Sequence, residues 1–424
     1  MSARPVTSPR SNLKKPVLVQ KYGGSSVANT ERIKNVARRV ARLSREGWAV
    51  TVVVSAMGKT TDELIGLSRK IARSPHPREM DMLLHAGEII STALVSMAIA
   101  EEGAPAVSLT GLQAGMLTDN LHTQARIQSV QGDRVLDEMA QGRVVVVAGF
   151  QGVTTENEIT TLGRGGSDTS AIAIAAGIGA QRCDILTDVE GVYTADPRVV
   201  SDARKMAWCS YDELLELAVL GAKVMHSRSV EIARRFSLPF QVCTSFSDAP
   251  GTLISNREFA RKEHGNVEEV AIRGIASNQR VVKVSILRVP DQPGVAAKLF
   301  SHIGKAGINV LLIVQAQSHE GTNDLTFVVS AESMPYLEPL LKDAVASVQG
   351  ERLLLDENIG TVSVVGEGVH REPRVAARTF SALAAQNINI DLISTSNLMI
   401  SCVVPRDRVD DAVRALHHEF FPTT

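Results

Sequence analysis

Short β-branched runs alternate with helical patterns over the first 255 residues of the chain. Segments 16–21 and 49–55 have the apolar character of buried strands, and between them the apolar residues of segment 30–46 recur at helical spacing. This order of strand, helix and strand predicts an α/β domain with a largely parallel sheet. The purely apolar runs indicate a sheet covered on both faces. Further strands are predicted at 105–110, 144–148 and 183–188.

The pattern changes between residues 256 and 268, where the chain becomes polar and charged, which indicates a domain boundary. Beyond it, Pro293 aligns with Pro373 and Asn309 with Asn389 at one constant offset of 80 residues. The match runs without gaps through a turn, a helix and the start of a strand, so we predict two copies of a βαβ module. The predicted ranges are a leader at 1–15, an α/β domain at 16–256, a linker at 257–268, and modules at 269–349 and 350–424.

Composition narrows the class of protein. The 424 residues are enough for two or three domains, and the formal net charge of -1 gives no electrostatic footprint for nucleic acid or an anionic membrane. No run approaches the roughly 20 apolar residues of a membrane span. Four widely spaced cysteines predict reduced, inert thiols and a cytoplasmic protein. The basic leader is expected to be disordered, although the lack of acidic residues before Glu31 leaves an organellar transit peptide open.

Polar segments with glycines follow predicted strands, which is where ligands bind in an open α/β sheet. In KYGGSS at 21–26, glycines let the backbone approach phosphate oxygens and Lys21 can hold a phosphoryl group, although a simple turn also explains the pattern. In TLGRGGSD at 161–168, N–H groups at a helix start gather beside Arg164, which can bind a carboxylate through two hydrogen bonds. Asp168 fits this site, or it is a plain N-cap.

A third segment, TDVEGVYTADPR at 187–198, fits the edge of a nucleotide site, with Tyr193 beside the base or ribose and Arg198 near phosphate. Ordinary loop chemistry is the alternative for this segment alone. The chain has no Walker loop, no protein-kinase H-R-D or D-F-G set, and no spaced G-x-G-x-x-G fingerprint. A phosphoryl-transfer enzyme with this sequence must therefore have another fold.

Together and in this order, these segments resemble the aspartate kinase branch of the amino acid kinase family. The similar segments include VQKYGGSSV, MLLHAGEIIS, TTLGRGGSDTSAIAIAA, TDVEGVYTADPR and GAKVMHSRSVEIARR. The two repeats resemble ACT domains, which are small modules that bind amino acids between paired copies. The resemblance covers residues 17–421. It implies an amino acid kinase-like α/β fold, with a mostly parallel sheet sandwiched by helices, followed by two ferredoxin-like βαβ ACT modules.

The resemblance also implies roles for single residues. Lys21 matches the phosphate-binding catalytic lysine, and Asp168 matches the catalytic aspartate that orients it. Glu88, a glutamate inside an apolar helical pattern, suits the ammonium of aspartate, and Arg164 suits its α-carboxylate. The positions that match the aspartate site are Ser55, Thr61, Glu88, Arg164, Gly165, Gly166 and Ser167. The positions that match the ATP site are Lys21, Tyr22, Gly23, Gly24, Thr187, Asp188, Tyr193, Arg198, Lys223 and Val224.

The implied reaction moves the γ-phosphate of ATP to the side-chain carboxylate of L-aspartate and gives 4-phospho-L-aspartate. This product starts the synthesis of lysine, threonine, methionine and isoleucine in the family. Because a carboxylate is already ionised at neutral pH, no general base is needed. Lys21, Mg²⁺ on the phosphates and the helix N-terminus at Ser167 are expected to bring the two anions together. No metal-ligating side chain is predicted.

The ACT modules imply feedback regulation by an amino acid, with lysine, threonine or both as the expected effector. Because each module is small, we expect pairing across chains and a homo-oligomer of at least two subunits. Asn397 and Met399 stand where an acid and a base are expected in the second module, so inhibition is expected to be altered. The predicted effector-binding residues are Asp291, Pro293, Gly294, Asn309, Gln315 and Asn389.

Two other functions stay open from the sequence. A related kinase could act on glutamate or acetylglutamate, although Glu88 and the paired ACT modules argue against it. A catalytically inactive amino-acid sensor is the other alternative, and the presence of Lys21, Arg164 and Asp168 together argues against it.

Overall fold

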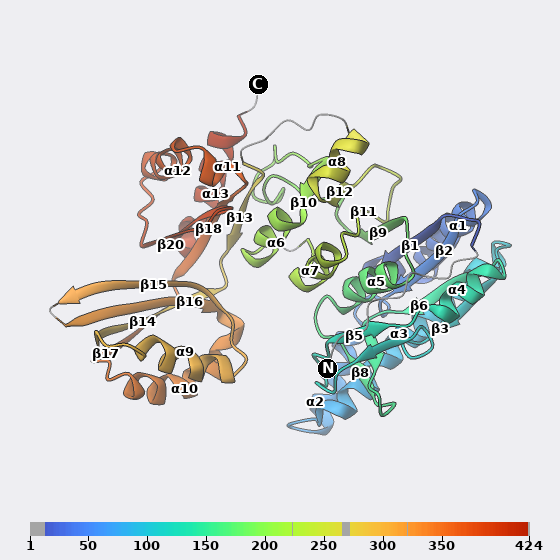
Figure 1. Cartoon of the computed structure of the whole chain (residues 1–424), viewed down its shortest axis with the longest axis horizontal. Coiled ribbons are helices and arrows are strands. Elements are labelled where there is room, and N and C mark those ends of the chain that lie inside the picture. Colours follow the sequence, from blue (N-terminus) through green and yellow to red (C-terminus); the bar gives the residue numbers. More distant parts are fainter. Residues whose placement is uncertain (1–12, 223, 265–271, 320, 423–424) are drawn as a thin grey trace. The chain divides into compact units, whose positions relative to one another are not determined.

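The computed structural model describes residues 13–222, 224–264, 272–319 and 321–422 (Figure 1). The chain forms two compact units. The described residues of 1–192, 205–215 and 223–267 belong to the first unit, and those of 193–204, 216–222 and 268–424 belong to the second. Most of the predicted α/β domain therefore lies in the first unit, and both repeated modules lie in the second.

An eight-stranded sheet forms the centre of the first unit. All neighbouring strands are parallel except β11 and β12, which confirms the predicted largely parallel sheet. The central strands β1, β2 and β6 are buried along their whole length, as their apolar sequences predict. The strands in order across the sheet are β10 (Trp208–Ser210), β12 (Thr252–Ser255), β11 (Phe240–Thr244), β9 (Arg182–Thr187), β1 (Val17–Tyr22), β2 (Ala49–Val54), β6 (Val144–Ala148) and β3 (Ala106–Leu109).

Helices lie on both faces of this sheet. Val52 of β2 shares a core with residues of α1 and α3. Its neighbour Thr51 points to the other face, where its hydroxyl lies 3.3 Å from Sδ of Met139 in α4. Helix α5 contacts β1 and β9 and packs on α7. The helices of this part of the chain are α1 (Thr30–Arg45), α2 (Thr60–Ile71), α3 (Pro77–Glu101), α4 (Asp133–Ala140), α5 (Gly166–Gly177), α6 (Tyr211–Val219), α7 (Ser227–Arg235) and α8 (Arg257–His264).

Helix α3 is long and apolar enough to cross a bilayer by length and composition alone, which differs from our interpretation of the sequence. The structure uses it as a core helix instead. Its buried residues include the polar Asp81 and Glu88, and its Val95 and Ile99 pack in the core with α1 and β2.

A second, four-stranded sheet in the first unit was not predicted. Its strands have only three or four residues, which is too short for the alternation of apolar and polar residues to be recognised. Strand β8 leads directly into the glycine-rich segment before α5. The strands in order are β5 (Ile127–Val130), β4 (Met116–Thr118), β7 (Gln151–Val153) and β8 (Ile159–Thr161).

The second unit contains two four-stranded sheets. The predicted repeat forms a strand, a helix and a strand in each copy: β14 (Val281–Pro290), α9 (Val295–Lys305) and β15 (Val310–His319), then β18 (Ile359–Val365), α12 (Arg374–Ala385) and β19 (Leu392–Thr395). A further strand and helix follow each copy: β16 (Thr322–Ser330) and α10 (Met334–Ser347), then β20 (Met399–Pro405) and α13 (Val409–Phe420).

The two sheets of this unit exchange outer strands. Strand β13 (Gly274–Asn278) precedes the first copy but pairs with β18 of the second, and β17 (Arg352–Asp356) pairs with β14 of the first. Both strands therefore lie on the opposite side of residue 350 from their partners. A local pattern of apolar residues does not show which sheet a strand joins, because pairing is decided by residues far away in the sequence.

Residues 193–204 fall within the predicted α/β domain but pack in the second unit. Ala195 and Val200 share an apolar core with residues of β13, β18 and α13. The hydroxyl of Thr194 lies 2.9 Å from Nε2 of the buried His417.

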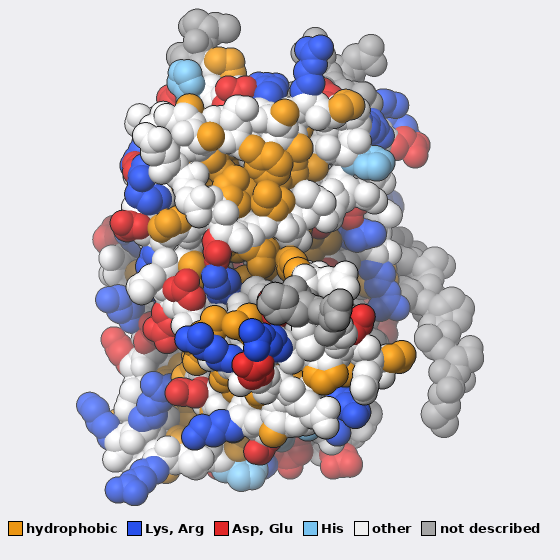
Figure 2. Space-filling model, turned by 90° about the vertical axis from the view of Figure 1, so that its left-hand side faces the viewer, with side chains coloured by type: hydrophobic (Ala, Val, Ile, Leu, Met, Phe, Trp, Pro, Cys, Tyr) orange, Lys and Arg blue, Asp and Glu red, His pale blue; other side chains and the backbone are white. Residues whose placement is uncertain are grey.

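Figure 2 shows one face of the molecule, on which apolar side chains gather in patches among polar ones. Within the second unit, Ile313 of β15 and Ile393 of β19 are 51% and 43% exposed. β15 and β19 are edge strands of the two sheets and contact each other. This unit thus exposes large apolar side chains where two modules meet.

Candidate active site

The carboxyl ends of β1, β2 and β9 meet in the middle of the large sheet. The N–H of Ser55 donates to the carbonyl of Tyr22 at 3.1 Å, and the N–H of Gly23 donates to the carbonyl of Leu186 at 3.3 Å. The KYGGSS segment, Ser55 and Thr187 are therefore neighbours. This edge of the sheet is where ligands bind in open α/β folds, so it is the candidate site.

Lys21 and Asp168, the predicted catalytic pair, form an ion pair of 2.7 Å between Nζ and Oδ1. Their side chains are only 10% and 15% exposed, so water screens the pair little. Lys21 lies on β1, and Asp168 lies in the first turn of α5, which contacts β1. A Cβ on Gly23 would lie 3.2 Å from Nζ of Lys21. The glycine therefore keeps the space beside this ammonium open to a ligand.

The turn that carries Arg164 requires glycines on both sides. Gly163 and Gly165 have φ values of 76° and 68°, in the left-handed region that favours glycine. Gly165 is the N-cap of α5 and no side chain caps the helix, so the alternative that Asp168 is the N-cap is wrong. Arg164 is exposed, and among the described residues it makes no hydrogen bond or ion pair. A free guanidinium thus stands at a helix N-terminus, an arrangement suited to an anion.

Glu88 of α3 is 3% exposed. Its Oε1 accepts a hydrogen bond from the N–H of Ala56 at 3.2 Å, and its Oε2 has no hydrogen-bond partner within the described part of the chain. Burial raises the pKa of Glu88 to about 7, although the hydrogen bond from Ala56 opposes this shift. A buried acceptor without a donor is costly. Because Ala56 follows Ser55 at the end of β2, this oxygen is well placed to receive an ammonium group of a ligand.

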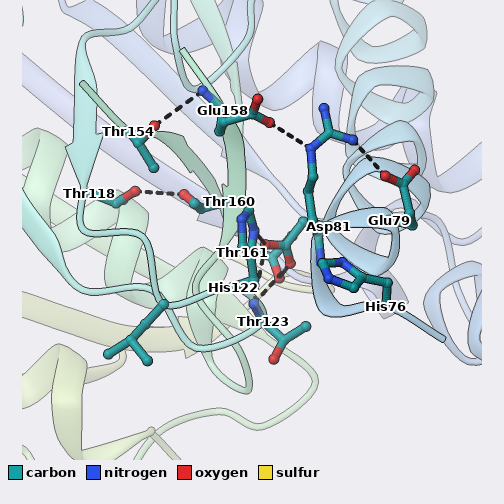
Figure 3. A network of polar contacts seen from close by, with 12 residues as sticks. His76, Glu79, Asp81, Thr118, His122, Thr123, Thr154, Glu158, Thr160 and Thr161 are labelled. Carbon is teal, nitrogen blue, oxygen red and sulfur yellow. Dashed lines mark hydrogen bonds and ion pairs between the residues drawn. The ribbon is translucent and has the colours of Figure 1, made fainter. Parts of the chain in front are cut away.

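A network of polar contacts ties α3 to β8 and to the loop after β4 (Figure 3). The Asp81 carboxylate is wholly buried and accepts hydrogen bonds from the Thr161 hydroxyl at 2.5 Å and from the Thr123 N–H at 3.0 and 3.2 Å. Its Oδ2 lies 2.7 Å from Nδ1 of His122. A hollow of about 470 Å³ beside this network is lined by polar groups, including His122 and Glu158, and none of the predicted site residues lines it.

Comparison with known proteins identifies the family. The amino acid kinase family matches residues 16–244, and the ACT domain family matches residues 284–344 and 362–420. An aspartokinase of Corynebacterium efficiens is 46% identical over 407 residues, which cover 95% of this chain and 96% of the relative. An aspartokinase of Pseudomonas aeruginosa is 45% identical over 404 residues, which cover 95% and 97%. This chain belongs to the aspartokinase family.

Solved aspartokinases share the fold. The aspartate kinase of Synechocystis is 41% identical, with a TM-score of 0.53, and the match covers 96% of this chain and 70% of that one. Aspartokinase III of E. coli, solved with aspartate and ADP, has a TM-score of 0.80 at 24% identity and covers 96% and 100%, which shows the fold alone. The predicted amino acid kinase fold and ATP-dependent aspartate kinase activity are thus confirmed, as are the ACT domains that make the enzyme allosteric.

The structure places the predicted aspartokinase substrate residues around this edge of the sheet. Ser55 follows β2, and Thr61 lies in the first turn of α2. Gly166 and Ser167 open α5, and a Cβ on Gly149 would lie 2.9 Å from Cβ of Ser167. The end of β6 therefore approaches the start of α5 closely. The roles of these residues remain predictions.

Apart from Val224, which lies between α6 and α7, the predicted ATP-site residues of the first unit lie at or next to strand ends. They differ in which of their atoms a ligand can reach. Tyr22 is wholly buried and its hydroxyl donates to Gln20, so only its backbone can face a ligand. A Cβ on Gly24 would lie 2.8 Å from the carbonyl of Ala56, so glycine is required for this close approach. The Thr187 hydroxyl donates to Asp188 at 3.0 Å.

The structure does not bring all predicted ATP-site residues into one unit. Tyr193 and Arg198 belong to the second unit, where Arg198 forms an ion pair of 2.6 Å with Asp196. Lys223 lies outside the described residues, and Val224 follows it in the first unit.

Our interpretation of the sequence missed His226. This residue is the N-cap of α7, and a Cβ on Gly165 would lie 2.3 Å from its Cβ. Arg228 donates to the carbonyls of Leu162 at 3.0 Å and Ala125 at 2.7 Å. α7 therefore braces the turn that carries Arg164. The family resemblance of GAKVMHSRSVEIARR was the available signal, but nothing in one sequence shows which turn this helix packs against.

All but one of the predicted effector residues lie on the surface of the first ACT module. Gly294 is the N-cap of α9 with a φ of 94°, and Pro293, Asn309 and Gln315 are exposed. Asp291 accepts a hydrogen bond of 2.9 Å from the amide of Asn323, which the sequence interpretation did not single out. Asn389 holds the equivalent exposed position in the second module. The role of these residues in binding an effector remains a prediction.

Proposed function

We propose that aspartate and the γ-phosphate of ATP meet beside the Lys21–Asp168 ion pair. The observation that carries this proposal is the nearly buried ion pair of 2.7 Å that joins Lys21 at the end of β1 to Asp168 in the first turn of α5. The turn that leads into the same helix presents Arg164. A cation held by an anion keeps its position as charge develops on a transferred group, which is the preorganisation that phosphoryl transfer requires.

In this proposal, Arg164 binds the α-carboxylate of aspartate through two parallel hydrogen bonds, since its guanidinium has no protein partner among the described residues. Glu88 binds the ammonium with the oxygen that lacks a donor. Ser55, Thr61, Gly165, Gly166 and Ser167 complete the aspartate site. The side-chain carboxylate then faces Lys21 and attacks as an anion, so no residue needs to act as a base.

We further propose that ATP binds along the glycine edge formed by Gly23, Gly24 and the backbone of Tyr22, with Thr187 and Asp188 beside it. Val224 is a further proposed nucleotide-site residue of the first unit. The roles of Tyr193 and Arg198 in the second unit, and of Lys223 outside the described residues, stay predictions from the family resemblance. Mg²⁺ suits this arrangement, because it is usually held by phosphates, water and one or two carboxylates. Among the described residues no three acidic, histidine or cysteine side chains gather to hold a metal ion. The ion would supply charge neutralisation on the phosphates, and Asp188, which follows β9 at this edge of the sheet, is a carboxylate that could face it.

For regulation, we propose that lysine, threonine or both bind at Asp291, Pro293, Gly294, Asn309, Gln315 and Asn389. The related structure of E. coli aspartokinase III with lysine and aspartate supports this class of effector. We propose a homo-oligomer of at least two subunits, since Ile313 and Ile393 leave apolar surface exposed on edge strands. A cytoplasmic location is supported by four free, buried cysteines.

A coupled assay of ADP release tests the substrate assignment. Parallel reactions contain L-aspartate, L-glutamate, acetylglutamate or no acceptor, each with and without Mg²⁺. We expect turnover with aspartate and Mg²⁺ only. Preference for glutamate or acetylglutamate would support the related kinases, and no turnover with any acceptor would support the inactive sensor.

A further inference from the structure

The Asp81 carboxylate has no part in the mechanism above, yet it is wholly buried and accepts three hydrogen bonds. The Thr123 N–H donates to both carboxylate oxygens, and the Thr161 hydroxyl donates to Oδ1 (Figure 3). Nδ1 of His122 lies 2.7 Å from Oδ2. A buried carboxylate is costly unless each oxygen is bonded. These contacts satisfy it completely, so the network holds its members at fixed separations.

The network joins the two elements that carry the proposed groups for the amino acid end of aspartate. Glu88 follows Asp81 by seven residues, or two helical turns, so both lie on the same face of α3. Arg164 follows Thr161 by three residues, through the braced glycine turn. The hydrogen bond from Thr161 to Asp81 is therefore a direct tie between the helix of Glu88 and the strand that leads to Arg164.

We propose that Asp81 and Thr161 are positioning residues that set the separation between Glu88 and Arg164. This inference rests on the proposed roles of those two residues. The ammonium and the α-carboxylate of aspartate are attached to one carbon atom, so their two partners must keep a fixed separation to bind both groups at once. Small displacements of such partners cost large factors in binding.

The same strand supplies a matched control. Thr160, the neighbour of Thr161 on β8, is equally buried, but its hydroxyl lies 2.6 Å from the hydroxyl of Thr118 in β4. That contact stays within the small sheet and does not reach α3. Thr161→Val and Thr160→Val therefore remove one buried hydroxyl each from adjacent positions, and only the first cuts the tie to α3.

The experiment measures KM for aspartate, KM for ATP, kcat and the melting temperature of Thr161→Val, Thr161→Ser and Thr160→Val in the full chain. We expect Thr161→Val to raise the aspartate KM about tenfold, with the ATP KM within about twofold of the original. Thr161→Ser keeps the hydroxyl and should restore the original aspartate KM. Thr160→Val should lower the melting temperature without changing the aspartate KM. Asp81→Asn provides the same comparison if Thr161→Val does not fold.

Equal effects of Thr161→Val and Thr160→Val on the aspartate KM would overturn the inference, as would a parallel rise of both KM values. Glu88→Gln and Arg164→Ala, measured in the same series, separate this failure from a failure of the proposed function. If those two variants leave the aspartate KM unchanged, the site assignment itself is wrong. If they raise it and Thr161→Val does not, only the positioning role is wrong.

Discussion

The proposed catalytic residues and the proposed effector residues are held in different ways. Lys21 and Asp168 are nearly buried and bind each other within one chain. The predicted effector residues are exposed on the surface of small modules, where the Asp291 side chain accepts a hydrogen bond from the amide of Asn323. The first kind of site is preorganised before a ligand arrives, whereas the second leaves space for a partner surface or a ligand to complete it.

The largest effect is expected at the preorganised pair. Lys21→Ala and Asp168→Ala should each lower kcat by a factor of about 100 or more, because both side chains act on developing charge and not on packing. Lys34→Ala, which removes an exposed lysine paired with Glu31 on α1, is the control and should keep kcat. Steady-state assays with circular dichroism check this, and near-normal turnover in either folded variant would contradict the assignment.

A smaller and more selective effect is expected at Arg164. Arg164→Ala should raise the aspartate KM by about 10- to 100-fold while the ATP KM changes little, since a bidentate guanidinium contact to a carboxylate belongs to the acceptor alone. Arg164→Lys should recover only part of the loss, because an ammonium cannot form the two parallel bonds. Titration of both substrates checks this prediction. Equal loss of both affinities would show that Arg164 is not specific to aspartate.

Glu88 should make aspartate binding depend on pH. Its pKa of about 7 means that the free enzyme carries a neutral acid below that value, which cannot pair with an ammonium group. The aspartate KM should therefore fall severalfold as pH rises from 6 to 8, and Glu88→Gln should have a high KM that does not change over this range. A pH profile of Glu88→Gln that matches the original enzyme would rule out this role.

The same pKa shift should lower the stability of the folded enzyme as pH rises, although it improves aspartate binding over the same range. Because folding raises the pKa of Glu88 from 4.5 to about 7, the protonated form is favoured in the folded state. Its contribution to the free energy of unfolding is complete below about pH 4.5 and is lost as pH rises through 7. Melting temperatures of the original enzyme and Glu88→Gln, compared at pH 5 and pH 8 without aspartate, check this sign. The melting temperature of Glu88→Gln minus that of the original enzyme should be larger at pH 8 than at pH 5.

The smallest effect on activity is expected in the regulatory unit, which is the second unit with its two ACT modules. Asp291→Ala should weaken inhibition by lysine or threonine by about tenfold and leave kcat without effector within about twofold, because it removes one charged partner from an open site. Asp343→Ala on α10 is an exposed acidic control. Titration of lysine and threonine, singly and as a pair, together with sizing of the intact enzyme, checks this. A monomer would contradict the proposed homo-oligomer, and tight inhibition by lysine alone would contradict our interpretation of Asn397 and Met399.

The sequence predicted those parts of the fold that leave a local trace. Apolar runs predicted the strands β1, β2 and β6, and the glycines around Arg164 predicted the start of a helix. It could not predict that Lys21 and Asp168 touch, since they are 147 residues apart and only the family resemblance joined them. Asp81 was missed for a related reason. A charged residue near the start of α3 is typical of an exposed face, but the short strand β8 and the loop after β4 contact the Asp81 carboxylate, which is buried.

The strand exchange in the regulatory unit dictates the order in which that unit can assemble during synthesis. β13 leaves the ribosome before the entire first copy of the repeat, yet its partner β18 emerges after it. Likewise, the sheet of the first copy lacks an outer strand until β17 has been made. Neither copy is a complete, independent folding unit, and the long separation between partners slows their pairing. A break in the chain near residue 350 would divide both sheets, so the two copies are expected to melt as one cooperative body.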